Sequence, residues 1–449
     1  MNRVVKTALE SLTVYRGILR DEAVNALYLV LKDVTNKSIN FSDFINGYCD
    51  FYYKLVNHNP EVCFKDYLIE KIIFDDNAFS KLCEKVTLDC VGESLVKAVE
   101  NDLACLNVVS SVSAKDIKEA ALKILDKSGS ENDIITNLPE WSQGNGKDNI
   151  PANILTTEVG EIFKLFKSSD DWRKCLKPMA DFYKKNGSGM FANYKGFVWE
   201  KNQGKGYLKG VSYTDPVRFS DLIGYELQRK EVIDNTLQFL KGYPANNILL
   251  YGDRGTGKSS TLKALLNEYS HLGLRLIELP KAYLADLPHV LREIRDRQLR
   301  FIIFIDDLAF SDNEENYTAL KAVLEGGLES KPQNVVIYAT SNRRHLIKER
   351  FSERSGLASG NYDDEVRAAD TLQEKLSLAD RFGITITFSS PDQKEYLEIV
   401  DGLARNRKLN IDAETLHREA LRWELHYNGR SPRTARQFID WLEGRVSNL

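Results

Sequence analysis

Residues 252–259 read G-D-R-G-T-G-K-S, which matches the phosphate-loop pattern G-x-x-x-x-G-K-[ST] at every fixed position. A short apolar segment of strand type precedes the loop, and apolar residues at helical spacing follow it over 260–269. A glycine-rich turn between a strand and a helix directs several backbone N–H groups at one point, which favours phosphate over the alternative of an ordinary glycine turn. We expect Lys258 to contact the β- and γ-phosphates of a nucleoside triphosphate and the Ser259 hydroxyl to bind Mg²⁺. The predicted nucleotide-binding residues of the loop are Gly252, Asp253, Arg254, Gly255, Thr256, Gly257, Lys258, Ser259 and Ser260.

Two acids follow a second apolar strand, residues 300–305. A phosphate loop needs a carboxylate at the tip of a nearby strand to complete the Mg²⁺ shell, and Asp306 suits that role. Asp307 is then expected to orient and deprotonate the attacking water; the alternative is a solvated turn. The next strand, 335–341, ends in a polar cluster whose side chains could hydrogen-bond the water or the γ-phosphate.

Alternating strands and helices must position these side chains. We expect strands at 248–251, 274–279, 301–306, 335–341 and 384–388, with helical stretches between them, as in a five-stranded parallel sheet with crossovers. Only helical patterns follow residue 390. The sequence therefore predicts an α/β core over 215–389 and a small helical domain over 390–449.

The first half of the chain carries weaker signals. Residues 1–126 read as a helical domain, 127–153 as a Ser/Gly/Asn-rich linker, and 154–214 as a helix plus a β-hairpin. Aromatic residues at helical spacing over 41–52 follow the possible caps Asn40 and Ser42. Such a stripe is usually core, and a ligand or partner groove is the alternative.

Composition narrows the class of protein. The 449-residue chain is 43% hydrophobic and 28% charged, with a net charge of −4, so it has no global basic field for nucleic acid. No stretch approaches the roughly 20 apolar residues of a membrane span, and no signal-peptide pattern is present, so we expect a cytoplasmic protein without a membrane partner. The six cysteines form no C-x-x-C pair and are expected to be reduced and mostly buried.

The region from about residue 215 to the C-terminus resembles the AAA+ ATPases. The segments that carry the resemblance are F-S-D-L-I-G-Y-E (219–226), Y-G-D-R-G-T-G-K-S-S (251–260), F-I-D-D-L (304–308), Y-A-T-S-N-R-R-H-L (338–346) and S-P-R-T-A-R-Q-F (431–438). Their wording is closer still to a bacterial family of single-AAA+ ATP-binding proteins of unknown function. The resemblance implies an AAA+ core, a helical lid, ATP and Mg²⁺, and a homo-oligomer with shared sites.

The resemblance also assigns roles to single residues. It implies that Leu222, Ile223 and Gly224 enclose the adenine and that Asn342 is sensor 1. Arg381 resembles an arginine finger that reaches a neighbour's γ-phosphate, the alternative being a local ion pair with Asp380 or Glu374. Arg433, with Ser431 as helix cap and Pro432 in the first turn, resembles sensor 2. Arg430 and Arg436 compete for that role, and the sequence leaves Arg343 and Arg344 undecided.

The sequence thus predicts a Mg²⁺-dependent ATPase that remodels a macromolecular partner, a protein or nucleic acid bound through the N-terminal domain. Most of the superfamily has Glu where this chain has Asp307, so we expect slow hydrolysis. The main alternative is a nucleotide-gated, DNA-associated loader or initiator-like switch with little hydrolysis. A small-molecule kinase is a third possibility, which the arginine-finger segment and the lid disfavour.

Overall fold

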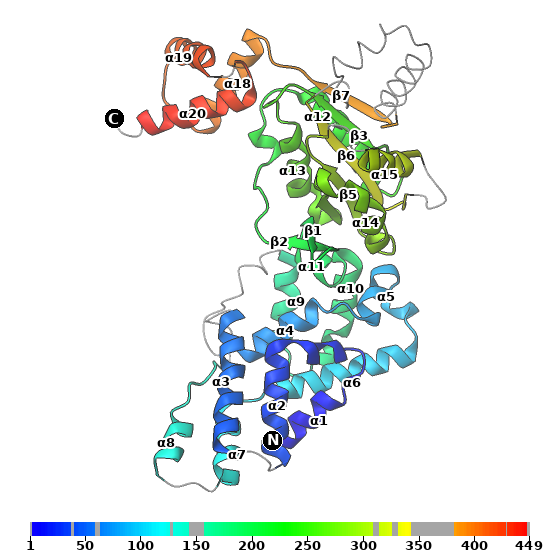
Figure 1. Cartoon of the computed structure of the whole chain (residues 1–449), viewed down its shortest axis with the longest axis vertical. Coiled ribbons are helices and arrows are strands. Elements are labelled where there is room, and N and C mark those ends of the chain that lie inside the picture. The colour runs from blue at the N-terminus through cyan, green and yellow to red at the C-terminus, as the bar shows by residue number, and fades with distance from the viewer. Residues whose placement is uncertain are drawn as a thin grey trace. The chain divides into compact units, whose positions relative to one another are not determined.

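The computed structural model describes residues 2–36, 40–58, 63–125, 129–142, 157–308, 314–325, 331–342, 381–427 and 429–446. The chain forms two compact units, Met1–Asn193 and Tyr194–Leu449 (Figure 1). The first unit is helical over its described residues, and the second contains a β-sheet with helices around it. No helix among the described residues is both long and apolar enough to cross a membrane.

The first unit is a bundle of helices around one hydrophobic core, which begins with Val5 and Leu9 and ends with Tyr183 and Ala192. Its α-helices are α1 (Asn2–Glu10), α2 (Glu22–Asn36), α3 (Phe41–His58), α4 (Phe64–Ile73), α5 (Ala78–Lys85), α6 (Glu93–Ser110), α7 (Ala114–Leu125), α8 (Ser130–Thr136), α9 (Thr157–Ser168), α10 (Leu176–Asn186) and α11 (Met190–Asn193). Short 3₁₀ helices lie at Arg16–Arg20, Leu88–Cys90 and Trp172–Cys175.

The aromatic stripe lies on α3 and belongs to the core. Phe44, Tyr48 and Phe51 are buried, and Trp141 packs against the last two with ring centroids 5.9 and 5.0 Å away. Asn40 caps the helix, because its side-chain oxygen accepts a hydrogen bond from the Asp43 N–H at 2.9 Å. The stripe therefore stabilises the bundle and does not form an open groove.

Two expectations about this unit were wrong. Part of the predicted linker is helical: residues 130–136 form α8, whose Ile135 is buried in the core. Acidic residues Glu131 and Asp133 favour the start of this helix, which composition alone concealed. The six cysteines are free, as expected, but they are not mostly buried. Only half of them are buried, namely Cys63, Cys83 and Cys175.

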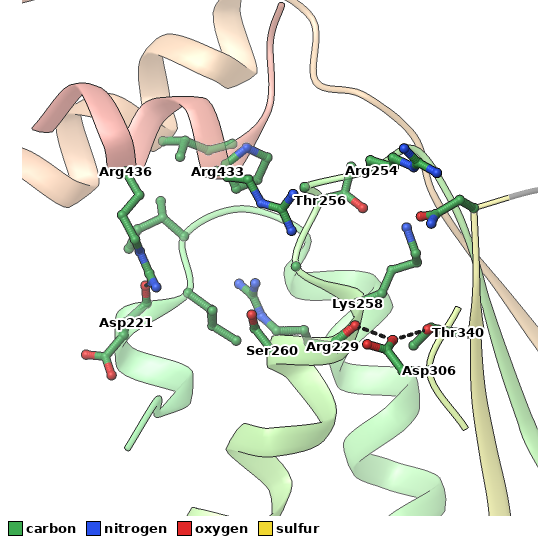
Figure 2. A pocket seen from close by; sticks show the side chains of 18 of the residues that line it. Asp221, Arg229, Arg254, Thr256, Lys258, Ser260, Asp306, Thr340, Arg433 and Arg436 are labelled. Atoms are coloured by element: carbon green, nitrogen blue, oxygen red, sulfur yellow. Dashed lines mark hydrogen bonds between the residues drawn. The ribbon is translucent and has the colours of Figure 1, made fainter. Parts of the chain in front are cut away.

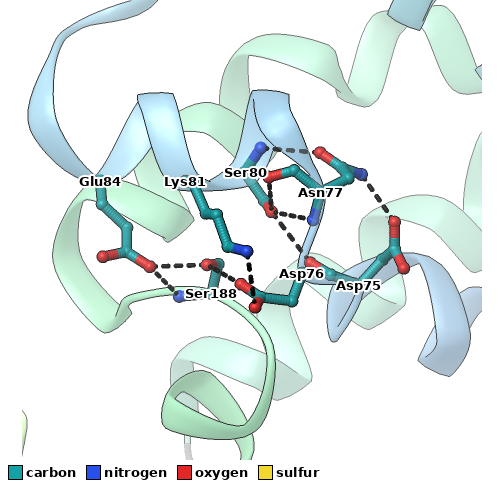
Figure 3. Close-up of polar contacts among 7 residues, drawn as sticks. All are labelled: Asp75, Asp76, Asn77, Ser80, Lys81, Glu84 and Ser188. Carbon is teal, nitrogen blue, oxygen red and sulfur yellow. Dashed lines mark hydrogen bonds and ion pairs between the residues drawn. The ribbon is translucent and has the colours of Figure 1, made fainter. Parts of the chain in front are cut away.

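The Gly187–Gly189 turn is built into this unit as a structural element. Ser188 is fully buried; its N–H and hydroxyl donate to Glu84 Oε1 of α5 at 2.9 and 2.6 Å, and its hydroxyl also contacts Asp76 (Figure 3). Gly189 has φ +58°, and a Cβ there would lie 2.8 Å from the Asp76 side chain. These contacts explain the glycine-rich segment as a turn that a side chain could not enter.

The second unit contains a seven-stranded sheet in the order β2-β1-β4-β5-β6-β3-β7. The five expected strands are present, and all neighbouring pairs among them are parallel. The predicted number of strands was too low, because the hairpin β1–β2 extends the sheet. Strand β1 pairs antiparallel with β2 and parallel with β4. The strands are β1 (Gly196–Asn202), β2 (Lys205–Val211), β3 (Ile248–Gly252), β4 (Leu274–Glu278), β5 (Arg300–Ile305), β6 (Val335–Ser341) and β7 (Ile384–Phe388).

Helices cover both faces of this sheet (Figure 1). Side chains of α12 (Glu226–Leu240) and α13 (Lys258–Tyr269) pack with alternate strand residues in one core cluster. Figure 1 shows α14 (Leu287–Ile294) and α15 (Glu314–Glu325) on the other side. Since both faces are covered, β5 and β6 are almost entirely apolar and buried. Short 3₁₀ helices lie at Phe219–Asp221, Ser270–Leu272 and Lys281–Asp286.

Three helices with a core of their own end the second unit: α18 (Gln393–Asn406), α19 (Ala413–His426) and α20 (Pro432–Val446). We refer to them as the lid. Asp392 and Asp412 cap the first two helices by accepting hydrogen bonds from Glu395 N and Thr415 N. Ile223 and Tyr225 from the segment before α12 pack against the lid core.

Candidate nucleotide site

The phosphate loop connects β3 to α13 and has the backbone that its glycines permit. Gly252, Gly255 and Gly257 have φ of +134°, +78° and +93°. A Cβ at Gly252 would lie 2.1 Å from the Phe388 carbonyl oxygen, so the loop also needs glycine for its approach to β7. The result is a strand–loop–helix turn that opens at the N-terminus of α13.

Lys258, the first residue of α13, is 6% exposed, and its ammonium group lies inside the loop. Nζ donates to the carbonyl oxygens of Gly252 and Asp253 at 3.0 and 2.6 Å. Burial lowers the pKa of Lys258, while the nearby carboxylates of Asp253, Asp306 and Asp307 raise it. The ammonium is thus placed where an anion inside the loop would meet it.

One hydrogen-bonded array joins the tips of three elements beside the loop. Ser259 Oγ of α13 donates to Asp306 Oδ1 at 2.7 Å, and the Thr340 hydroxyl of β6 donates to the same oxygen (Figure 2). The Thr340 hydroxyl also accepts from the Asp307 N–H at 3.0 Å. A single buried threonine therefore holds both acids at the end of β5.

Asn342 and Asp307 complete this edge of the sheet. Asn342 Nδ2 donates to Asp307 Oδ1 at 2.7 Å. Asp307 has φ +49°, a left-handed conformation that Asp and Asn adopt more readily than most residues, and its side chain is exposed to the cavity. The two neighbouring acids therefore have different partners: the Asp307 carboxylate accepts from Asn342, and the Asp306 carboxylate accepts from Ser259.

The start of α20 lies against the phosphate loop. Arg433 N–H donates to the Gly255 carbonyl at 3.1 Å, and Ser431 Oγ caps the helix by accepting from Thr434 N. A Cβ at Gly255 would lie 3.0 Å from Ser431 Oγ. The lid thus contacts the loop through the segment that the sequence suggested for sensor 2.

Of the three arginines considered for sensor 2, one does not line the cavity. Arg430 forms an ion pair with Glu424 at 2.8 Å and does not line the cavity. Arg433 and Arg436 both line it, and Arg436 donates to the Asp221 carbonyl at 3.3 Å (Figure 2). Arg433 and Arg436 therefore remain as the candidates for sensor 2.

Residues 222–225 form a turn that leads into α12. Gly224 and Tyr225 both have left-handed backbone, at φ +77° and +59°. Tyr225 stacks on Phe388, with ring centroids 5.2 Å apart, and its hydroxyl donates to the Ser389 carbonyl at 2.7 Å. These contacts hold the turn so that Leu222 and Ile223 line the cavity.

These elements enclose a cavity of about 550 Å³, within the size range of ligand sites. One end is apolar, with Leu222, Ile223, Ile399 and Leu403; the other holds Lys258 and the acid array. A flat base with a phosphate chain has this distribution of chemistry, and Ser259 and Asp306 offer the hard oxygen ligands that Mg²⁺ prefers. The lining residues are Asp221, Leu222, Ile223, Arg229, Arg254, Gly255, Thr256, Gly257, Lys258, Ser259, Ser260, Asp306, Asp307, Thr340, Asn342, Ile399, Leu403, Pro432, Arg433 and Arg436.

Some predicted site residues do not line this cavity. Gly252 and Gly224 act through the backbone geometry described above. The Asp253 carboxylate accepts from Ser390 N and Oγ at 2.7 and 2.8 Å, and these hydrogen bonds lower its pKa. Asp253 thus joins the loop to the segment that leads into the lid.

Arg381 does not line the cavity and forms an ion pair with Glu325 at the end of α15. The partners considered from the sequence, Asp380 and Glu374, lie outside the described residues, as do Arg343 and Arg344. An arginine that does not reach the site of its own chain is compatible with a role in a neighbour's site.

Sequence reasoning missed several lining residues. Thr340 stood in the polar cluster before Asn342, a signal that could have singled it out. Asp221 and Arg229 flank the predicted adenine segment, but nothing in the letters shows that they face a cavity. Ile399 and Leu403 follow the ordinary apolar spacing of a helix and join the site only when the lid packs.

The family model described as "Protein of unknown function (DUF815)" matches residues 192–446. The chain belongs to this family. The DUF815 match spans the second unit almost completely and ends at the last residue of α20.

Curated relatives place this DUF815 protein among AAA+ ATPase homologues, confirming the resemblance. A "Putative 26S proteasome regulatory subunit homolog" of Methanocaldococcus jannaschii is 26% identical over 239 residues, which are 46% of this chain and 63% of the relative. The ATP-dependent zinc metalloprotease FtsH of Acholeplasma laidlawii is 26% identical over 232 residues, 47% of this chain and 33% of the relative. The chain thus spans less than two thirds of either relative.

Among solved structures, the RuvB Holliday junction branch migration motor of Thermotoga maritima is similar at 17% sequence identity and a TM-score of 0.36. The similarity covers 52% of this chain and 66% of the RuvB chain.

Proposed function

We propose that this DUF815 protein is a Mg²⁺-dependent ATPase that hydrolyses ATP to ADP and phosphate and uses the cycle to remodel a macromolecular partner. The observation that carries the proposal is the array of Ser259, Asp306, Thr340, Asp307 and Asn342 beside the Lys258 ammonium. It presents a cation, a metal-binding pair and a second carboxylate to one cavity. A simple nucleotide-storage site would not need the second acid.

Each residue then has a task set by its position. Lys258 neutralises the phosphate chain in the loop, and Ser259 with Asp306 would hold Mg²⁺, which offsets negative charge on the phosphates. Asp307 accepts the proton of the attacking water. Asn342 orients Asp307 through their 2.7 Å hydrogen bond, and Arg433 adds positive charge from the lid.

Motion of the lid would link this chemistry to work. Arg433 N–H contacts Gly255, and Asp253 contacts Ser390, so the segment that leads into the lid and the start of its last helix both contact the phosphate loop. A change of phosphate charge in the loop can therefore shift the lid. We propose that a client, protein or nucleic acid, binds the helical first unit and that copies of the chain assemble with shared sites.

The test compares wild type with Lys258→Ala and Asp307→Asn. Lys258→Ala should abolish ATP binding. Asp307→Asn, which keeps the left-handed backbone acceptable, should bind ATP but hydrolyse it at least about 100-fold more slowly. In a pull-down with ATP, Asp307→Asn should retain partners that wild type releases. Wild-type hydrolysis by Asp307→Asn would show that Asp307 is not the base.

The hydrogen bond between Asn342 and Asp307 fits a second function, a nucleotide-gated switch with little hydrolysis, for which we propose DNA as the partner. Asn342 occupies one oxygen of the shorter acid and leaves fewer lone pairs for water. ATP-dependent retention of DNA at moderate salt, without stimulated phosphate release, would favour this switch over remodelling of a protein.

A further inference from the structure

Arg229 is a buried cation that faces the cavity and that the proposed chemistry does not use. It lies on α12 and is 8% exposed, whereas Arg254, Arg433 and Arg436 are exposed. Figure 2 shows its guanidinium directed into the space enclosed by the phosphate loop and the lid. Burial lowers the pKa of the Arg229 guanidinium, which nevertheless stays charged.

This guanidinium has little to neutralise it. Among the residues that the structure describes, its one hydrogen-bond partner is Glu226 Oε1, at 3.4 Å. The Glu226 side chain is 76% exposed, and the same oxygen accepts from the Gly224 N–H at 3.1 Å. A guanidinium carries five N–H donors, so most of them remain available in the cavity. A buried charge with so weak a partner is costly unless a ligand supplies acceptors.

The position of Arg229 selects the part of the nucleotide that would supply them. Glu226 connects it to the turn at 222–225, which forms the apolar end of the cavity. Lys258, Ser259 and Asp306 occupy the other end. A nucleotide with its base at the apolar end and its terminal phosphates in the loop has its α-phosphate between the two.

We propose that Arg229 binds the α-phosphate of the nucleotide through charge-assisted hydrogen bonds. This rests on the proposed function, because it assumes that the cavity takes ATP. A planar guanidinium fits two phosphate oxygens at once, and the buried setting strengthens the contact. Because AMP, ADP and ATP share the α-phosphate, Arg229 sets affinity for all three, unlike a residue that reads the γ-phosphate.

The experiment measures Kd for adenosine, AMP and ADP by calorimetry with the full chain. Arg229→Met removes the charge and keeps a long apolar side chain. Lys230→Met is the matched control, because Lys230 is the next residue of α12, is exposed, and does not line the cavity. The unfolding midpoint of each variant without nucleotide reports on the fold.

Arg229→Met should weaken AMP and ADP binding by about 10- to 100-fold and leave adenosine binding unchanged. The control variant Lys230→Met should bind all three ligands as wild type does. Its nucleotide-free unfolding midpoint should equal or exceed that of wild type, because a poorly paired buried charge is removed. Equal ADP affinity, an equal loss for adenosine, or a lowered midpoint with unchanged affinity would overturn the role of Arg229. Wild type that fails to bind ADP would instead contradict the proposed function.

Discussion

Thr340 gives the candidate site its internal geometry. Its hydroxyl donates to Asp306 and accepts from the Asp307 N–H, so one atom positions both the acid proposed to bind Mg²⁺ and the acid proposed as base. A hydroxyl can do this because it has one donor and two acceptor positions. The side chain is 2% exposed, so water cannot replace either contact.

Thr340→Val should therefore slow hydrolysis without unfolding the chain. Valine has nearly the same shape but makes neither hydrogen bond, and we expect kcat to fall about 10- to 100-fold, with a smaller change in the Kd for ADP. Steady-state phosphate release and ADP titration measure the two quantities. Thr340→Ser, which keeps the hydroxyl, is the control and should retain most activity. A normal kcat in Thr340→Val would contradict the proposed role of Thr340 in positioning the two acids.

If Lys258 contacts the phosphates as proposed, nucleotide affinity should depend on pH. Burial holds its pKa below the usual value in the free protein, and bound phosphates would raise it again. As pH rises, Lys258 therefore loses its proton in the nucleotide-free protein before it does so in the complex. Nucleotide affinity should be highest below the lowered pKa and should fall as the pH rises through it. Binding heats at alkaline pH in two buffers of different ionisation enthalpy should reveal proton uptake. A protein that binds without proton uptake would contradict this.

At the scale of elements, the lid helix α18 approaches the turn at residues 222–225, and a glycine of α18 lies at the contact. Gly402 is buried in α18, and a Cβ there would lie 2.7 Å from Ile223 Cγ2. Ile223 lines the cavity. The position of the lid and the shape of the apolar end are therefore coupled through one close contact.

Gly402→Ala should weaken ADP binding several-fold, because the added methyl displaces either Ile223 or the lid. Gly444→Ala in α20 is the control: nothing lies within 4 Å of its Cβ, and helix propensity should raise the free energy of unfolding by up to about 1 kcal/mol. Combining Gly402→Ala with Ile223→Ala should recover part of the affinity. Normal affinity in Gly402→Ala would show that the lid adapts freely.

At the scale of the whole molecule, the site of one chain lacks the proposed arginine finger. Arg381 pairs with Glu325 and does not line the cavity that holds Lys258 and Asp307. If Arg381 serves a neighbour's γ-phosphate, that ion pair must open on assembly. The second copy would then complete the charge around the transferred phosphate.

ATPase activity per protomer should accordingly rise with protein concentration. Arg381→Ala should lose this rise and most of the activity, yet bind ADP as wild type does. Mixing Arg381→Ala with Lys258→Ala chains should restore some activity, since each supplies what the other lacks. Phosphate release across a dilution series measures the effect. Activity that is flat on dilution, or that survives Arg381→Ala, would rule out the trans mechanism.

Much of the second unit was predictable from local patterns. Buried parallel strands are continuous apolar runs, and all five were located, together with the loop at 252–259. The edge hairpin was seen as a hairpin, but its pairing with β4 is a contact between distant residues, which periodicity does not report. Helix α8 was missed because its composition is that of a loop.

The sequence by itself determined the phosphate loop, the acids at the end of β5 and the strand that precedes Asn342, because these depend on residue type and short spacing. Only the tertiary structure decided that Thr340 holds both acids, that Asp253 contacts Ser390, and that Arg229 faces the cavity. The physical reason is that each of these contacts joins segments separated by tens of residues or more, or depends on which face of a helix is buried. Packing of the whole unit settles both.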